Sequence, residues 1–256
     1  MSRLVLDGVA FATNGSPIID DVSLSVDPGE TVAVIGPSGA GKTTILRLAA
    51  TFERPTTGVV RHAGTDVWAV NEADRLALRR RLAMVFQEPN LFDASVERNV
   101  RYGRQVRRPW RERFTRRCLE AVDLTNGSDS AVEWLELVGM ADRRGDSVAE
   151  LSTGEAHRVA MARALAVDPD VLLLDEPTAN LDPRNTAVIE EAIGAAADQE
   201  TGVLIATHDM AQAQRVADRT AVVIDGQLAE VGPTHRIFER PDDPRTGRFI
   251  DGELVY

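Results

Sequence analysis

A short apolar run that ends in a glycine-rich loop constrains the fold of this chain more than any other feature. Val32–Ile35 are four consecutive apolar residues, and the loop GPSGAGKTT, residues 36–44, follows at once. After the loop, apolar residues recur at helical spacing at Ile45, Leu48 and Phe52. The pattern predicts a buried strand, a tight loop and an amphipathic helix in direct succession.

The loop matches the pattern G-x-x-x-x-G-K-[ST], which binds phosphate groups when it connects a strand to a helix. Its glycines let backbone N–H groups converge on phosphate oxygens, and the helix start adds a field that favours anions. We expect Lys42 to contact the β- and γ-phosphates of a nucleotide, and the hydroxyl of Thr43 to bind Mg²⁺. The residues predicted to bind the nucleotide here are Gly36, Pro37, Ser38, Gly39, Ala40, Gly41, Lys42, Thr43 and Thr44.

Lys42 is the only lysine in the chain, and every other strongly basic side chain is arginine. A lysine ammonium is a compact point charge, whereas the guanidinium of arginine is a wide planar fork. We therefore expect lysine to be dispensable on the surface of this protein and required inside the loop.

The excess of acidic over basic side chains limits which partners the chain can bind and indicates the environment in which it works. The chain has 256 residues, enough for one large domain, with 40 acidic against 29 basic side chains and a net charge of −11. Acid excess argues against a nucleic-acid partner, which usually meets a basic face. Together with the lone lysine it indicates a salt-rich cytoplasm, because salt screens the repulsion among carboxylates. A GC-rich genome, which also favours arginine over lysine, is the alternative explanation.

The sequence carries no sign of export or of membrane insertion. Its one cysteine, Cys118, allows no internal disulfide and fits a reducing compartment. The N-terminus lacks a signal pattern, and no apolar run approaches the ~20 residues of a membrane helix. We expect a soluble cytoplasmic protein that meets a membrane only through a partner.

The organisation changes along the chain. The N-terminal third reads as strands, among them RLVLDGVAFA and IDDVSLSVDPG. The middle, about residues 71–150, is helical and arginine-rich, with an exposed charged helix predicted over 104–118 and broken near Pro109. The last third alternates strands with helices, which indicates a mainly parallel sheet. Residues 241–256 read as a C-terminal tail.

Two acids stand at the end of a second apolar run. In VLLLDE, the residues Val171–Leu174 predict a buried strand whose end exposes Asp175 and Glu176. Asp175 suits the coordination shell of Mg²⁺, and Glu176 is placed to polarise an attacking water. Together with the glycine loop, the two acids indicate nucleotide hydrolysis.

The stretch LSTGEAHRVAMARAL discriminates among nucleotide-binding proteins. Ser152 followed by Glu155 predicts a capping box that opens a helix. At this point the chain resembles the ATP-binding cassette (ABC) family, whose signature is LSGGQ. Further family motifs follow the expected order: Phe11 as the adenine-stacking aromatic, Gln87 in MVFQEPN, ANLD ending at Asp182, and His208 in IATHD. The resemblance extends from about residue 4 to residue 232.

The resemblance implies a fold and a domain plan. The expected fold class is α/β, a P-loop NTPase core of the ABC type with a mainly parallel sheet and an N-terminal antiparallel β region. A helical subdomain at about residues 88–160 is inserted in a single domain that spans 1–240.

The resemblance also assigns roles to individual residues. In this family two subunits sandwich two ATP molecules head-to-tail, so Ser152 and Gly154 would contact the γ-phosphate bound by the partner. His208 would hold the phosphate within its own subunit, Gln87 would touch Mg²⁺ or the water, and Asp182 belongs to the nucleotide-binding set. The expected catalytic residues are Glu176, His208 and Gln87, and the expected Mg²⁺ ligands are Thr43, Gln87 and Asp175.

The signature departs from the family pattern at two positions. Thr153 replaces a glycine and Glu155 replaces a glutamine. A Cβ narrows the approach to phosphate, and a carboxylate repels it unless the side chain turns back to cap the helix. Glu155 lies at the capping position, so we expect weakened rather than abolished function. Phe11 lacks the hydroxyl of the usual tyrosine but keeps the stacking face.

The implied function is that of an ATP-hydrolysing subunit on the cytoplasmic face of a membrane, driving solute import through a separate permease. A permease helix would couple to the arginine-rich middle, and an extracytoplasmic solute-binding protein would act indirectly. Residues 84–103, MVFQEPNLFDASVERNVRYG, look most like cassettes of phosphate, tungstate or molybdate importers.

Two other functions share these motifs. One is a non-transport cassette that serves assembly or division. The other is a DNA-repair-type ATPase, in which long coiled coils separate the phosphate loop from the signature. Here Lys42 and Ser152 are only 110 positions apart, which disfavours the DNA-repair alternative.

Overall fold

The computed structural model describes residues 3–107 and 130–253, which divide into two compact units. The first unit comprises Met1–Gln87, Pro169–Ala179 and Ile193–Tyr256, and the second comprises Glu88–Asp168 and Asn180–Ala192. The domain plan derived from the sequence, with a subdomain at about 88–160, stays a prediction. Most of the charged helix predicted over 104–118, including Pro109 and Cys118, lies outside the described residues.

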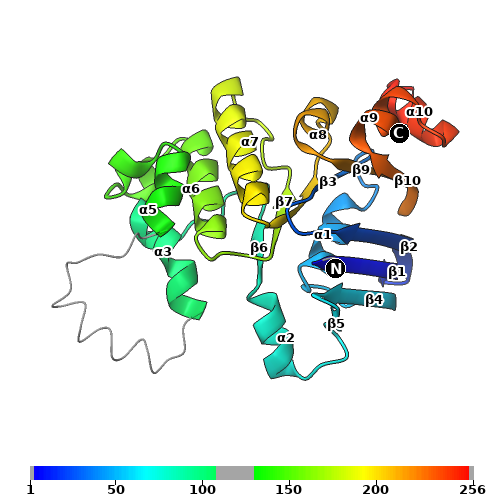
Figure 1. Ribbon diagram of the computed structural model, residues 1–256, viewed down its shortest axis with the longest axis horizontal. Helices are drawn as coiled ribbons and strands as arrows, with labels where there is room; N and C mark the ends of the chain where they lie inside the picture. Colours follow the sequence, from blue (N-terminus) through cyan, green and yellow to red (C-terminus); the bar gives the residue numbers. More distant parts are fainter. Residues whose placement is uncertain (1–2, 108–129, 254–256) are drawn as a thin grey trace. The chain divides into compact units, whose positions relative to one another are not determined.

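A six-stranded sheet forms the centre of the first unit, in the order β10-β9-β3-β8-β7-β6 (Figure 1). All neighbouring strands from β9 to β6 pair in parallel, and only β10 is antiparallel. The strands are β3 (Thr31–Ile35), β6 (Leu82–Val85), β7 (Val171–Asp175), β8 (Gly202–Ala206), β9 (Arg219–Ile224) and β10 (Gln227–Pro233). The predicted mainly parallel sheet is confirmed.

Alternate residues of the central strands pack on opposite faces of this sheet. Val32 and Val34 of β3 join a hydrophobic cluster with α1 (Lys42–Ala49), whereas Ala33 and Ile35 join a cluster with residues of α8 (Met210–Val216). Because both faces are covered, each central strand is a continuous apolar run rather than an alternation of apolar and polar residues.

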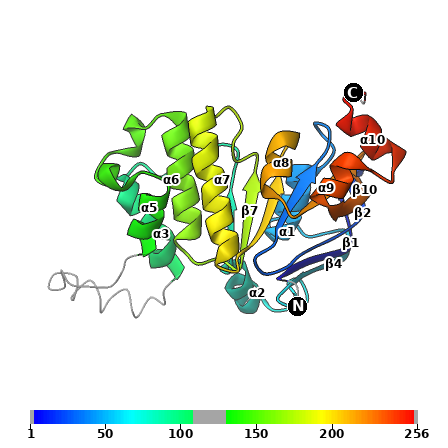
Figure 2. The same cartoon turned by 45° about the horizontal axis from the view of Figure 1, so that its top comes forward.

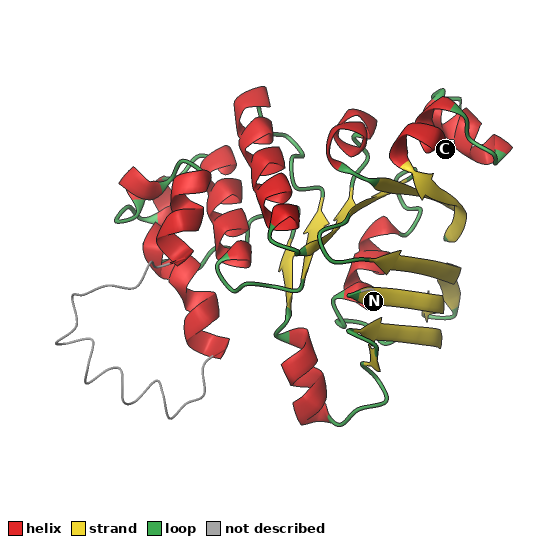
Figure 3. Ribbon diagram, viewed as in Figure 1, coloured by secondary structure: helices red, strands yellow, loops and turns green. Residues whose placement is uncertain are grey.

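A four-stranded antiparallel sheet has the order β2-β1-β4-β5 (Figure 3). Its core residues pack into the same hydrophobic cluster as α1. This confirms the predicted N-terminal antiparallel β region. Asn14 and Gly15 connect the first two strands with φ angles of 50° and 80°, which is the geometry of a tight hairpin turn. The strands are β1 (Leu4–Thr13), β2 (Ser16–Val26), β4 (Thr57–His62) and β5 (Thr65–Asp66).

The described part of the second unit is built from helices (Figure 2). Both α3 and α5 pack against α6, and the boundary with the first unit falls inside α7. These elements are α3 (Val96–Arg107), α5 (Ser130–Leu137), the short 3₁₀ helices η1 (Ala141–Arg143) and η2 (Val148–Glu150), α6 (Thr153–Leu165) and α7 (Pro183–Asp198). Within residues 3–107 and 130–253, no helix combines the length and apolarity needed to cross a bilayer.

The C-terminal segment differs from the predicted tail. It forms α10 (Pro244–Ile250), which packs on α9 (Thr234–Glu239) and on β10. Phe249 joins the hydrophobic cluster of α8 and β9, and Thr246 is fully buried. The segment therefore contributes core to the first unit.

The remaining described helix, α2 (Glu72–Arg79), is capped by Asn71, whose side chain accepts a hydrogen bond from the Asp74 backbone N–H.

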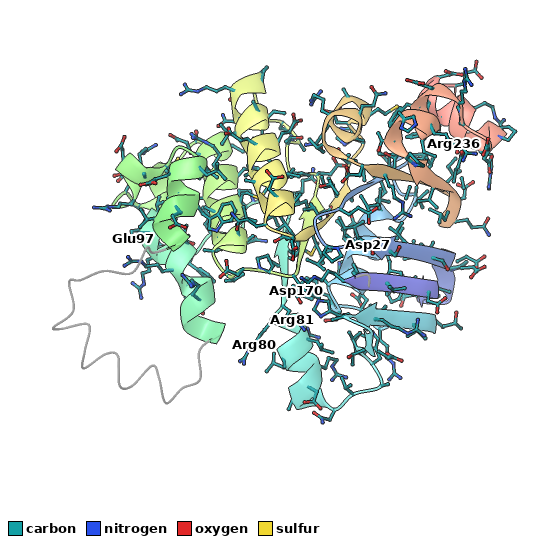
Figure 4. All side chains as sticks on the ribbon, in the orientation of Figure 1. Asp27, Arg80, Arg81, Glu97, Asp170 and Arg236 are labelled. Carbon is teal, nitrogen blue, oxygen red and sulfur yellow. The ribbon has the colours of Figure 1, made fainter. Side chains whose placement is uncertain are left out.

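A buried polar cluster joins the antiparallel sheet to the starts of β6 and β7. His62, at the end of β4, is fully buried, and its Nε2 lies 3.4 Å from Oδ2 of Asp170. Arg81 contacts the same carboxylate, and the two side chains lie together in Figure 4. Arg3 lies 3.9 Å from the other oxygen of Asp170. One carboxylate thus faces two guanidinium groups and an imidazole.

The cluster predicts a pH dependence of folding. Burial lowers the pKa of His62 from 6.5, against the attraction of Asp170, and Arg81 and Arg3 lower it further. The unfolded chain therefore binds this proton more readily, so stability is complete above about pH 6.5 and falls as the pH drops below it. His62→Gln should remove this component, whose slope is at most about 1.4 kcal/mol per pH unit. Urea unfolding at a series of pH values measures it, and His235→Gln, at an exposed histidine, should leave it unchanged.

Candidate functional site

The carboxyl ends of four parallel strands meet at one edge of the six-stranded sheet, where α/β proteins bind ligands. The glycine loop follows β3 and leads into α1. Gln87 comes two residues after β6, Glu176 follows β7, and His208 comes two residues after β8. Most of the residues predicted from the sequence to be functional in the first unit are therefore brought to this edge.

Two glycines allow the loop to pack closely against its neighbours. A Cβ on Gly36 would lie 2.0 Å from the backbone oxygen of Val223 in β9. Gly41, the residue before α1, has a φ of 101°, and a Cβ there would lie 2.5 Å from Cδ1 of Ile19. Any larger residue at either position would push the loop away from the strands beside it.

Lys42 is enclosed by the loop that precedes it. Its side chain is 8% exposed, and Nζ donates hydrogen bonds to the backbone oxygens of Gly36, at 2.8 Å, and Pro37, at 2.9 Å. Burial lowers the pKa of Lys42, while the charges of Glu176 and Asp175 oppose that shift. The ammonium is thus held at the N-terminus of α1, which has no side-chain cap, and it lies near the carboxylates of Asp175 and Glu176.

Thr43 and Asp175 connect α1 to β7. The Thr43 hydroxyl donates to Oδ1 of Asp175 across 3.0 Å, and Asp175 is 7% exposed. Burial raises the pKa of Asp175, and the hydrogen bond from Thr43 partly offsets this. A buried carboxylate beside a hydroxyl supplies the hard oxygen ligands that Mg²⁺ prefers.

Glu176 and His208 form a second polar pair. Oε2 of Glu176 lies 2.8 Å from Nδ1 of His208 and accepts from the His208 backbone N–H at 3.3 Å. The Thr207 hydroxyl also donates to it, at 3.4 Å. Glu176 has a φ of 50°, an uncommon conformation for a residue with a Cβ, and its backbone N–H donates to Ala206. The strand β7 ends at Asp175, directly before this residue.

Gln87 and Phe11 are the remaining predicted site residues of the first unit. Gln87 is exposed at the end of the segment that follows β6. Phe11 is partly buried in β1 and pairs across the hairpin with Ile19, the residue that packs against Gly41. The hairpin therefore presents Phe11 from a strand adjoining the start of α1.

In the second unit, α6 begins with a complete capping box. Ser152 Oγ accepts from the backbone N–H of Glu155 at 3.4 Å, and Oε2 of Glu155 accepts from the backbone N–H of Ser152 at 2.9 Å. The capping box predicted from the sequence is confirmed. Thr153, the other departure from the family pattern, is exposed.

Gly154 is buried against the start of α7. A Cβ on Gly154 would lie 2.4 Å from Nδ2 of Asn185. Asp182 holds that amide, since it accepts hydrogen bonds from the side chain and backbone N–H of Asn185 and from the backbone N–H of Arg184. These contacts hold the pKa of Asp182 below its ordinary value. They also explain why glycine is required at 154 whereas threonine fits at 153.

Sequence reasoning missed several residues that shape the site. Asn185 fixes Asp182 beside Gly154, Thr207 contacts Glu176, and Arg143 binds the carboxylate of Glu155. Thr207 and Arg143 act on residues distant in the sequence, so spacing along the chain carries no signal of them, whereas Asn185 lies only three residues after Asp182, a spacing typical of a helix cap. For Thr207, its position beside His208 at a strand end was an available clue.

The described residues contain no group of three or more His, Cys, Asp or Glu side chains that could hold a metal alone. The oxygen pair of Thr43 and Asp175 fits an ion that takes one or two protein ligands and completes its shell with water and phosphate oxygens, as Mg²⁺ does.

Comparisons with known proteins give a consistent picture. The family model described as ABC transporter matches residues 19–179. Phosphate import ATP-binding protein PstB 2 of Natronomonas pharaonis is 57% identical over 99% of this chain and 88% of that protein. A probable anion import ATP-binding protein of Haloferax volcanii is 52% identical over 100% of this chain and 88% of its own length. Among solved structures, cbiO1 from Clostridium perfringens, part of the ABC transporter complex cbiONQ, matches in fold with a TM-score of 0.79 at 24% identity, over 98% of this chain and 99% of that one.

Proposed function

This chain belongs to the ABC transporter family, and on that premise we propose that it is the ATP-hydrolysing subunit of an importer for phosphate or a related oxyanion. Support for the solute class comes from the two relatives whose names give phosphate import and anion import. The residues of the permease and of the solute-binding protein choose the solute, so the choice among phosphate, tungstate and molybdate lies outside this chain.

The observation that carries the proposal is the group of side chains at the carboxyl edge of the sheet. Lys42, Thr43, Asp175 and Glu176 come from two segments more than 130 positions apart in the sequence. The Thr43–Asp175 hydrogen bond and the Glu176–His208 contact bring their reactive groups to one edge. A structural role alone gives no reason to bury an ammonium and a carboxylate where burial disfavours the charge of both.

In this proposal the loop and its lysine bind the phosphates of ATP. The start of α1 has no side-chain cap, so its N–H groups are suited to phosphate oxygens. On ATP binding, Nζ of Lys42 would exchange its hydrogen bonds to the backbone oxygens of Gly36 and Pro37 for bonds to charged phosphate oxygens. A buried ammonium favours this exchange, because hydrogen bonds between charged groups are stronger. The ring of Phe11 would stack on the adenine, and Gln87 would contact Mg²⁺ or the attacking water. Mg²⁺, held by Thr43 and Asp175 with Gln87 nearby, would neutralise charge on the phosphates.

Glu176 is the proposed general base. Its carboxylate is fixed by contacts with Thr207 and His208, the two residues that follow β8. It takes the proton of the attacking water, while His208 orients and stabilises the terminal phosphate from within the same subunit. A carboxylate fixed before the reaction needs no reorganisation when the proton moves.

The family implies a second ATPase subunit and a membrane permease as partners. We propose a head-to-tail homodimer on the cytoplasmic face of the membrane, in which Ser152 and Gly154 meet the γ-phosphate bound by the other copy. Asp182 holds Asn185 against Gly154 and so sets the shape of this second contact. An extracytoplasmic solute-binding protein would deliver the solute to the permease.

Adaptation to high salt is part of the proposal. The net charge of −11 and the single lysine support it, as does similarity to proteins of Natronomonas pharaonis and Haloferax volcanii. Thermal unfolding should shift upward between about 0.1 M and about 2 M KCl, because salt screens repulsion among carboxylates. A melting temperature that does not rise would instead favour a compositional origin in a GC-rich genome.

Glu176→Gln should bind ATP normally and lose most hydrolysis, because the amide keeps the shape of the side chain but accepts no proton. The variant should also accumulate an ATP-bound dimer. Phosphate release and size-exclusion chromatography with ATP and Mg²⁺ measure the two effects. Glu239→Gln, at an exposed position on α9, is the matched control. Hydrolysis at the wild-type rate in Glu176→Gln would show that Glu176 is not the general base.

Lys42→Arg should fail although it keeps the charge. The loop closes on a single ammonium between two backbone oxygens, and a planar guanidinium is too wide for that space. Both Lys42→Arg and Lys42→Ala should lose nucleotide affinity by at least about 1.4 kcal/mol, roughly tenfold. Calorimetric titration measures the affinity, and thermal unfolding without nucleotide checks the fold. Normal binding by the arginine variant would make the lone lysine an accident of composition.

A further inference from the structure

The carboxylate of Glu155 at the start of α6 is occupied on both oxygens. Oε2 accepts from the backbone N–H of Ser152 at 2.9 Å and from its hydroxyl at 2.8 Å. Oε1 accepts from Nη1 of Arg143 at 2.6 Å. The hydrogen bonds from Ser152, and then that from Arg143, lower the pKa of Glu155 to about 2. Glu155 is therefore an anion at neutral pH.

Arg143 reaches this carboxylate from the end of η1. Its Nε donates to Oδ2 of Asp146 at 2.7 Å, so one guanidinium bridges two carboxylates. The hydrogen bonds from Asp146 and Glu155 raise the pKa of Arg143. The cluster of Arg143, Asp146 and Glu155 carries one net negative charge, and removal of the guanidinium would leave two adjacent negative charges at the helix start.

Other charged groups nearby do not replace Arg143. Arg158 interacts with the charge of Glu155, but its Nη1 donates to the backbone oxygen of Val138 at 2.8 Å, and burial lowers its pKa. Among the described residues, Arg143 is the guanidinium that the structure places in hydrogen-bond contact with Glu155.

An anionic side chain at this position opposes a phosphate. The start of a helix attracts anions, and the proposed function uses the start of α6 for the γ-phosphate held by the second subunit. Glu155 lies one residue beyond Gly154, so its charge weakens that attraction. Its hydrogen bonds with Ser152 also occupy the hydroxyl that would meet the phosphate.

We propose that Arg143 is a positioning residue for ATP hydrolysis, which offsets the charge of Glu155 so that the start of α6 accepts the ATP of a second subunit. This inference rests on the proposed function. It explains how the chain uses glutamate where the family carries an uncharged glutamine. Arg143 touches neither nucleotide nor water in this account, and it acts only through Glu155.

The test is a cycle of variants in the full-length chain. Arg143→Gln should lower the ATPase rate about tenfold and weaken ATP-induced dimerisation measured in the Glu176→Gln background. ATP binding to the single subunit should stay unchanged, because the phosphate loop is intact. Arg143→Lys should keep part of the activity, since it keeps a positive charge. Arg144→Gln is the matched control, because Arg144 is the exposed neighbour.

Rescue separates charge neutralisation from a purely structural role. Glu155→Gln in the Arg143→Gln background should restore most of the rate, because glutamine still caps the helix but has no charge to neutralise. A double variant as impaired as Arg143→Gln, or an Arg143→Gln variant with wild-type activity, would overturn the inference.

A different result would contradict the proposed function, independently of the Arg143 variants. If Glu176→Gln left hydrolysis unchanged, the assigned catalytic base would be wrong whatever the Arg143 cycle gave. Thermal unfolding of each variant shows whether a loss of rate comes from loss of the fold.

Discussion

The parallel pairing of β3 with β8, and of β8 with β7, determines which side chains of this protein can meet. Asp175 is level with Ala206, which is in turn level with Val34. The chain therefore leaves all three strands at the same height and places Glu176 beside the segment that carries His208. A slip of one residue in either pairing would turn each side chain to the opposite face, and Asp175 would no longer point to Thr43.

The charged side chains at this edge are each held by a different partner. Asp175 and Glu176 are adjacent in sequence, yet they have different partners, the hydroxyl of Thr43 and the imidazole of His208. Lys42 is near both acids and is held by backbone oxygens rather than by either carboxylate. The site thus carries an excess of negative charge, which suits binding of a divalent cation together with a phosphate chain. In the second unit, the guanidinium of Arg143 forms ion pairs with two carboxylates, those of Asp146 and Glu155.

Local patterns in the sequence predicted the parts of the fold that depend on neighbouring residues. The apolar run before Gly36 predicted β3, the loop and α1, and the Ser152–Glu155 pair predicted the start of α6. Family resemblance, rather than periodicity, pointed to Gln87 and His208, whose roles stay predictions. Contacts made across long separations could not be read from spacing, as the pairing of His62 with Asp170 illustrates. The C-terminal helix was missed because its apolar content is low, although Phe249 anchors it in a cluster assembled from distant strands.

The lone lysine makes this chain a protein with a single side-chain amine. Burial lowers the pKa of Lys42, while the charges of Glu176 and Asp175 oppose that shift. The Nζ of Lys42 is enclosed by the oxygens of Gly36 and Pro37, so a bulky acylating reagent reaches it only when the loop opens. Covalent labelling of a lysine in this protein is therefore a direct measure of loop opening, free of background from any other lysine.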